Sequence, residues 1–214
     1  MGRTAGATAA GTRERLLRSA ADVFAGRGYD GARVSDIAAA AELSHGALYA
    51  YFGSKVELLV EALRAHGGRL LADLVAAHPT RPIADLLLQT GRSLRGRREQ
   101  DDQLFVEALL AARRDPEVVA PVRDYVRERA DWLAGLIRQA QARGELDPGL
   151  PAPAVAHFCL ALTAGTALLS PDLNDVDEQE WAGLLARLMT VLAPTDLAPT
   201  DPAQTHPPET GTAS

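Results

Sequence analysis

The chain has 214 residues, of which 47% are hydrophobic and 23% are charged, the composition of a globular protein with a substantial core. Its formal net charge of −6 argues against a protein that binds polyanions only through overall positive charge. The single cysteine, Cys159, excludes an internal disulfide, and residues 1–15 lack the apolar run of a secretory signal, so we expect a cytoplasmic protein.

The chain begins with residues 1–11, which are small and are predicted to form a disordered N-terminal arm. The first helix is predicted over residues 12–25, because apolar residues recur there at helical spacing and Gly26 and Gly28 then end the pattern. The apolar stripe of this helix consists of Leu16, Ala20, Val23 and Phe24. Residues 1–35 hold six arginines and three acids, so basic charge gathers near this end.

Two short helices joined by a brief turn follow. The first is predicted over residues 34–41, the turn over Glu42 to Ser44, and the second after Ser44, which can cap it. Such a pair is typical of a helix-turn-helix, in which the second helix enters the major groove of DNA.

The stretch from Leu43 to Lys55 also carries groups that suit a nucleic-acid backbone. Ser54 is predicted to cap the next helix, with Glu57 at the capping-box spacing. Lys55 is the only lysine of the chain and lies at the start of that helix, where an ammonium group and a helix N-terminus together favour phosphate. Tyr49 and Tyr51 add hydroxyl groups on rigid rings.

The rest of the chain is also predicted to be helical, without strand-like alternation, so we expect an all-α protein of about nine helices. The remaining helices are predicted over residues 54–77, 82–94, 104–112, 115–143 and 152–169, followed by a last helix that Asp175 or Asp177 caps and that ends at about residue 193. Gly67 and Gly68 weaken the middle of the first of these and form a candidate hinge. Residues 194–214 are rich in Pro, Thr and Asp and are predicted to be a disordered tail.

One helix has to be weighed as a membrane span, because residues 152–169 carry no formal charge. The segment is short, rich in alanine, contains His157 and two threonines, and has no basic cluster beside it. We therefore expect a helix buried within the protein or its dimer, and no contact with a membrane.

Residues 12–57 resemble the DNA-binding domain of the tetracycline-repressor (TetR) family. The resemblance covers about a fifth of the chain and is specific. The matching pieces are Thr-Arg-Glu-Arg-Leu-Leu from Thr12, Phe24-Ala-Gly-Arg-Gly-Tyr29, Val34-Ser-Asp-Ile-Ala38 and the whole stretch from Leu43 to Lys55. The family implies a helix-turn-helix domain, here residues 12–58, and a helical ligand-binding and dimerisation domain, here residues 59–193.

The resemblance also implies a function and a set of DNA contacts. The protein would be a homodimer that binds palindromic operator DNA, most simply as a repressor, and is released by a small molecule. By position in the motif, Tyr49 and Lys55 would contact phosphate, and His45, Gly46 and Ala47 would meet base edges. The other residues implied or predicted at the DNA are Arg33, Ser35, Ser44 and Tyr51.

This recognition helix departs from the family pattern, which often has Lys, Thr and His where His45, Ala47 and Ala50 stand. It is therefore poor in hydrogen-bond donors. We hypothesise that Ala47 contacts a thymine methyl group and that His45 is the main polar reader. Glu42 lies in the turn where the family often has glycine, so a positive φ there would cost on the order of 1 kcal/mol.

The second domain offers weaker signals. Aromatic residues on its helices are more often part of a core than contacts to a ligand, and a lone histidine such as His157 is more often a core or interface residue. With that alternative open, the candidate effector contacts are Phe105, Tyr125, Trp132, His157 and Thr163, with Arg138 a further polar candidate. We expect a small and largely apolar effector.

The last two helices are predicted to form the dimer interface, because a helix that is apolar all round must be covered on every side. The residues expected there are Phe158, Leu162, Gly165, Trp181, Leu184, Leu188 and Leu192.

No catalytic constellation, metal-ligand spacing or phosphate-binding glycine loop is evident in the sequence, so we expect neither an enzyme nor a cofactor or metal. Two alternatives remain open. The chain could be a helical small-molecule-binding protein that keeps the same fold, or an activator, since activation and repression differ only in where the operator lies.

Overall fold

The computed structural model describes residues 3–94, 100–169, 173 and 175–194. Within these residues it contains ten α-helices and no β-strand, which confirms the all-α prediction. The helices are α1 (Arg3–Gly31), α2 (Val34–Ala40), α3 (His45–Tyr49), α4 (Lys55–His66), α5 (Leu70–Ala77), α6 (Ile83–Ser93), α7 (Gln100–Arg114), α8 (Pro116–Ala142), α9 (Ala152–Leu168) and α10 (Glu178–Leu192).

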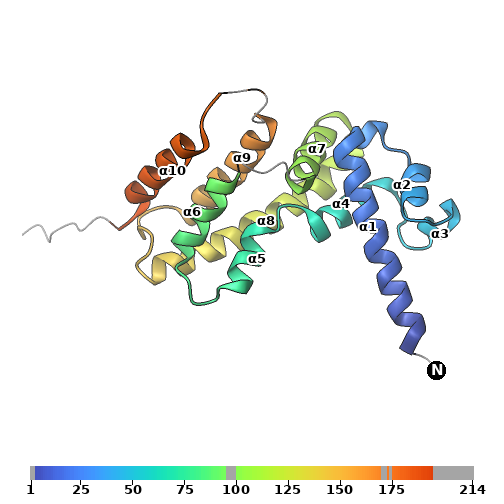
Figure 1. Cartoon of the computed structure of the whole chain (residues 1–214), viewed down its shortest axis with the longest axis horizontal. Coiled ribbons are helices and arrows are strands. Elements are labelled where there is room, and N and C mark those ends of the chain that lie inside the picture. Colours follow the sequence, from blue (N-terminus) through green and yellow to red (C-terminus); the bar gives the residue numbers. More distant parts are fainter. Residues whose placement is uncertain (1–2, 95–99, 170–172, 174, 195–214) are drawn as a thin grey trace, which may run out of the picture.

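Helices α1, α2 and α3 lie at one end of the molecule, and α6, α9 and α10 lie toward the other (Figure 1). The long helix α8 runs between the two ends, and α4 links the helix-turn-helix to it (Figure 1). The described part of the chain contains no helix with the length and apolarity to span a bilayer.

The buried side chains form two clusters. The first is built by α1 to α4 together with α7 and the first half of α8, and contains Phe24, Ile37, Leu48, Phe52 and Leu59 among its fully buried residues. The second lies between α5, α6, the second half of α8 and α9. The first cluster therefore includes side chains of α7 and α8, which belong to the predicted ligand-binding domain. The core around the helix-turn-helix extends beyond residue 58.

The first helix begins earlier and continues further than predicted. It starts at Arg3, so residues 3–11 are helical rather than a disordered arm. Four of these residues are alanine, which has the highest helix propensity and lets the helix extend toward the N-terminus. At the other end the helix bends at Gly28, whose φ of 74° is accessible to glycine at little cost.

The bend at Gly28 is held from α7. The carboxylate of Glu107 accepts a hydrogen bond of 2.7 Å from the backbone N–H of Tyr29 and pairs with Arg114, which also reaches Asp30. A Cβ at position 28 would lie 3.2 Å from that carboxylate, so the bend and Glu107 fit together closely. These contacts fix the end of α1 to the second half of the chain.

Glu107→Ala is expected to lower the free energy of unfolding by about 1–3 kcal/mol, because it leaves the partly buried N–H of Tyr29 without its acceptor. Urea denaturation measures the effect. The exposed Asp131→Ala on α8 is the matched control and is expected to change stability by less than about 0.5 kcal/mol. Equal effects of the two changes would contradict the role given to Glu107.

The helix predicted over residues 54–77 is two helices, which is why the structure has one helix more than predicted. Helix α4 ends at His66, and α5 begins at Leu70 after Gly68, whose φ is 54°. The carbonyls of Gly67 and Gly68 accept hydrogen bonds from Tyr125 and Arg129 of α8. Groups distant in sequence thus occupy carbonyls that a continuous helix would need.

Most of the other helix boundaries lie close to their predicted positions, but α7, which was predicted over residues 104–112, extends from Gln100 to Arg114. Asp115 caps α8, which starts at Pro116 even though Pro121 follows, and Asp177 forms a capping box with Glu180 at the start of α10. Apart from Pro194, the tail predicted over residues 194–214 lies outside the described residues.

Candidate nucleic-acid interface and effector pocket

The turn of the helix-turn-helix is closed by backbone hydrogen bonds. The N–H of Leu43 donates to the carbonyl of Ala38, and that of Glu42 donates to Ala39, the paired pattern of a Schellman motif. Glu42 has a φ of 57°, so it adopts the left-handed conformation that the turn requires although it is not glycine. The turn fixes the angle at which α3 leaves α2.

Helix α3 is short and is held at both ends. The Ser44 hydroxyl accepts a hydrogen bond of 3.2 Å from the N–H of Ala47, which confirms the predicted cap. Ser54 caps α4 by accepting from Glu57 N–H at 3.0 Å, while the Glu57 carboxylate accepts from Gly53 N–H, one residue before the partner expected in a capping box. Leu48 is buried and anchors α3 to the first core cluster.

The outer face of α3 carries the residues predicted to read DNA. Ser44, His45 and Gly46 are exposed, and Tyr49 is 46% exposed. The rings of His45 and Tyr49 meet edge to face, with their centroids 5.0 Å apart. Ala47 is half-buried beside them. A rigid pair of rings therefore projects from a helix whose other side is fixed in the core.

The flanking positions divide into two groups. Arg33 and Ser35 are exposed at the start of α2, and Arg33 makes no side-chain cap there. Tyr51 is half-buried, and its ring packs against the first core cluster.

Lys55 lies at the N-terminus of α4, and its Nζ is 4.3 Å from the centroid of the Tyr29 ring. Burial lowers the pKa of Lys55, while the charges of Asp30 and Asp115 oppose that shift. The ammonium group is thus held at a helix N-terminus by a ring that packs against it.

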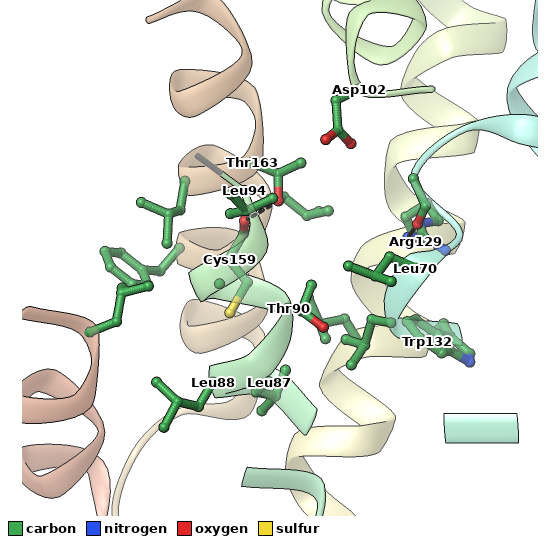
Figure 2. Close-up of a pocket in the computed structure, with 18 of the residues that line it drawn as sticks. Leu70, Leu87, Leu88, Thr90, Leu94, Asp102, Arg129, Trp132, Cys159 and Thr163 are labelled. Atoms are coloured by element: carbon green, nitrogen blue, oxygen red, sulfur yellow. Dashed lines mark hydrogen bonds between the residues drawn. The ribbon is translucent and has the colours of Figure 1, made fainter. Parts of the chain in front are cut away.

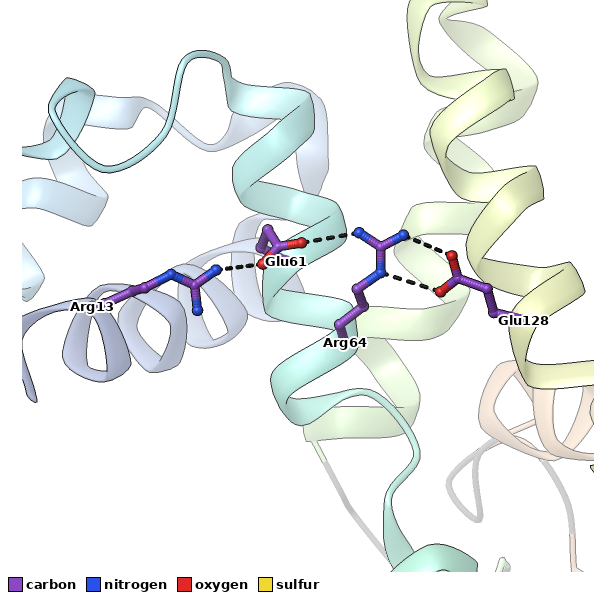
Figure 3. A network of polar contacts seen from close by, with 4 residues as sticks. All are labelled: Arg13, Glu61, Arg64 and Glu128. Carbon is purple, nitrogen blue, oxygen red and sulfur yellow. Dashed lines mark hydrogen bonds and ion pairs between the residues drawn. The ribbon is translucent and has the colours of Figure 1, made fainter. Parts of the chain in front are cut away.

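Polar contacts connect this end of the molecule to α8. Arg13 of α1 pairs with Glu61 of α4, Glu61 with Arg64, and Arg64 with Glu128 of α8, the last through two hydrogen bonds of 2.9 and 3.2 Å (Figure 3). These side chains are partly exposed, so each pair adds little to stability. Their main effect is to fix the orientation of α4 relative to α1 and α8.

Within this network, burial acts to raise the pKa of Glu61, but hydrogen bonds and charges from Arg64 and Arg13 outweigh it and hold the pKa below its ordinary value. A carboxyl group with a lowered pKa in the folded state stabilises the fold when ionised at neutral pH. That contribution is lost in acid, as the pH falls through the folded pKa.

The second half of the chain contains a pocket with an empty volume of about 1300 Å³, which includes the solvent at its mouth. Helices α5 to α10 contribute to its walls, and half of its lining residues are leucine (Figure 2). Of the predicted effector contacts, the pocket brings together Phe105, Tyr125, Trp132 and Thr163.

Two other polar candidates lie elsewhere. His157 is exposed on α9 and does not line the pocket, because the helix turns it away from α8. Arg138 is likewise exposed on α8. Sequence reasoning missed Arg129, which lines the pocket. The signal was present, since Tyr125, Arg129 and Trp132 are spaced by four and three residues and so share one face of a helix.

Cys159 also lines the pocket. Burial raises the pKa of this thiol to about 11, so it stays protonated at neutral pH and is a poor nucleophile. Among the residues that the structure describes, no group of three or more His, Cys, Asp or Glu side chains is arranged to hold a metal ion.

The residues predicted at the dimer interface are not all on one surface. Leu184 is exposed and lies outside the pocket, whereas Phe158 and Leu188 are exposed but also line the pocket. Leu162 and Gly165 are half-buried, and Leu162 lines the pocket as well. Trp181 donates a hydrogen bond of 2.9 Å from Nε1 to the carbonyl of Gly91. It therefore fastens α10 to α6.

Leu192 also turns inward and lines the pocket. The exposed apolar surface continues instead through residues that the sequence did not single out, namely Leu168, Leu169 and Val191. The apolar residues of α10 thus lie on two sides of the helix, with Leu192 on the side of the pocket and Val191 on the side of the solvent.

Comparison with known proteins places both halves of the chain. Residues 16–62 match the family model described as bacterial regulatory proteins of the tetR family. Residues 83–188 match a model described as a tetracyclin repressor-like C-terminal domain. The boundary between the two matches falls across the end of α4 and α5.

Curated relatives and solved structures give the same result. The chain is 32% identical to the transcriptional repressor BepR of Brucella suis biovar 1 over 168 residues, which cover 74% of this chain and 80% of that one. It is 26% identical to the transcriptional regulator UidR of Escherichia coli K12 over 171 residues, 80% of this chain and 84% of that one. A putative TetR-family regulator from Rhodococcus sp. has the same fold, with a TM-score of 0.73, 22% identity, and coverage of 85% of this chain and 98% of that one.

Proposed function

Because this chain belongs to the TetR family of bacterial transcriptional regulators, we propose that it is a dimeric repressor whose α3 reads operator DNA and whose pocket takes a releasing effector. The observation that carries the proposal is the outer face of α3. There the rings of His45 and Tyr49 project from a helix that Leu48 anchors in the core.

Each part of this face is given a role by its chemistry. His45, Gly46 and Ala47 face base edges, where an imidazole can donate or accept and a methyl group can contact thymine. The Tyr49 hydroxyl, Lys55 and the exposed residues Arg33, Ser35 and Ser44 contact phosphates and set the register of the protein on the duplex. The half-buried ring of Tyr51 supports α3 from behind.

Residues that belong both to the pocket and to the junction of α4 and α5 connect effector binding to DNA binding. Gly68, Leu70 and Leu71 line the pocket and lie at the junction of α4 and α5. Helix α4 in turn carries Lys55 at its other end and packs on α1. An effector that prefers a different position of this junction would shift the dimer away from the DNA-binding arrangement.

The proposal is tested by selecting duplexes from a random pool with the wild-type protein, followed by fluorescence anisotropy on the selected operator. Enrichment of a palindromic sequence is expected. Tyr49→Phe is expected to weaken binding by about tenfold, to a similar extent on all selected sequences, because it removes one hydrogen bond to phosphate. His45→Ala is expected to relax the preference at one position of each half-site.

Arg138→Ala, at an exposed site in the second half of α8, is the control and is expected to bind like the wild type. If no sequence is enriched, the protein is not a DNA-binding regulator and the small-molecule-binding alternative gains support. If His45→Ala keeps the full sequence preference, the role of His45 as base reader is wrong.

A further inference from the structure

The pocket lining contains one cationic side chain, and its position suits the binding of an anionic ligand. Arg129 is half-buried on α8, and its guanidinium carbon lies 5.1 Å from the centroid of the Trp132 ring (Figure 2). Its Nη2 donates to the carbonyl of Gly68. The guanidinium group is therefore held in place by a ring and by one carbonyl, and it faces a largely apolar space.

Arg129 has no ion-pair partner among the described residues of the pocket. Among the described residues, no carboxylate lies within ion-pair distance of its guanidinium group. The other charged residue of the lining is Asp102, which makes an interaction of its own and does not pair with Arg129. A cation in apolar surroundings loses its hydrogen bonds to water, and one neutral carbonyl replaces only some of them. An anion replaces the others with short, charge-assisted hydrogen bonds.

The rest of the pocket fits a hydrocarbon or aromatic body. Leu87, Leu133, Leu162, Leu188 and Met189 supply apolar walls, so the space beside Arg129 suits an apolar group. We propose that the effector is an anionic amphiphile, with a carboxylate that pairs with Arg129 and an apolar body that lies among these leucines. This proposal deepens the function proposed above and rests on it for its regulatory part.

The same residue connects ligand binding to α4. Arg129 holds the carbonyl of Gly68, and its neighbour Tyr125 donates to the carbonyl of Gly67 at 3.3 Å. A carboxylate that pairs with the guanidinium group competes with the Gly68 carbonyl for its N–H groups. Binding therefore weakens a contact that fixes the end of α4, and the change reaches the helix that presents Lys55.

Binding is tested without DNA, so that it does not depend on operator recognition. The probes are octanoate, decanoate and dodecanoate below their micelle concentrations, with decanol and decyltrimethylammonium as neutral and cationic analogues. The fluorescence of Trp132 in a Trp181→Phe protein reports binding, because Trp132 stacks on Arg129. At least one carboxylate is expected to bind at least about tenfold more tightly than its neutral or cationic analogue.

Arg129→Met keeps the length and apolar surface of the side chain but removes its charge, and it is expected to weaken carboxylate binding by about tenfold or more while leaving decanol binding unchanged. Arg129→Lys is expected to keep part of the preference for the anion. Arg138→Met, an exposed arginine on the same helix, is the matched control and should bind like the wild type. Thermal melts verify that each variant is folded.

The proposal is overturned if none of the carboxylates binds, if decyltrimethylammonium binds more tightly than decanoate, or if Arg129→Met keeps the affinity for decanoate. In a second arm, decanoate but not decanol should lower operator affinity, and less so in Arg129→Met. Carboxylate binding without any operator binding would support the ligand class and refute the repressor function, so the two failures are distinguishable.

Discussion

Leu184→Glu is expected to convert the proposed dimer to a monomer and to lower operator affinity by at least about a hundredfold, because a dimer that binds two half-sites gains from the second contact at high effective concentration. Leu184 is 51% exposed on α10 and does not line the pocket. Val191 lies seven residues further on and is 74% exposed. Residues spaced by seven share one helix face, so the two belong to one outward apolar stripe.

Helix α9 also carries exposed apolar residues. Phe158 is 52% exposed there, and Leu168 and Leu169 are exposed at its C-terminal end. Adjacent exposed apolar residues of this kind are rare on monomers and mark interfaces, and a carboxylate buried without a partner costs several kcal/mol. One glutamate in the stripe should therefore be enough to separate the subunits.

Size-exclusion chromatography with light scattering measures the change of mass. The matched control is Thr190→Glu, which adds the same charge at an exposed polar position of α10 and should remain a dimer. A Leu184→Glu protein that is still dimeric at micromolar concentration would show that this stripe is not the interface.

Gly67→Ala is expected to lower the free energy of unfolding by about 1–3 kcal/mol, the usual cost of forcing an extra methyl group into a packed site. A Cβ at this position would lie 2.6 Å from the carbonyl oxygen of Leu63 and 2.8 Å from the hydroxyl oxygen of Tyr125. The first neighbour is backbone and the second is a buried ring, so neither can move freely. The substitution would separate the end of α4 from α8.

Gly135→Ala on α8 provides the contrast. A Cβ there would meet no atom within 4 Å, and alanine in a helix is favoured over glycine, so this change is expected to raise stability by about 0.5–1 kcal/mol. Urea denaturation compares the two. If Gly67→Ala raised the free energy of unfolding as Gly135→Ala does, the junction of α4 and α5 would accommodate the extra methyl group, contrary to the close contacts described above.

The sequence by itself determined the features that depend on neighbours three or four residues apart. The caps at Ser44 and Ser54 bond to N–H groups three positions ahead, and both were predicted at the positions where they are found. For the last helix the sequence left Asp175 and Asp177 as alternatives, and Asp177 is the cap. The helix-turn-helix was likewise predictable, because its short turn leaves few ways to arrange α2 and α3. The family resemblance was carried by the same local residues and is confirmed.

Only the tertiary structure decided the features for which the local sequence allows two conformations or two packing arrangements equally well. The glycines at 67 and 68 allow either a weakened continuous helix or a break, and the side chains of Tyr125 and Arg129 favour the break because they bind the two carbonyls. In the same way, the apolar stripe of α10 does not reveal which of its sides packs on α6. The hydrogen bond from Trp181 to Gly91, ninety residues away in the chain, selects that side and leaves Leu184 on the outer surface.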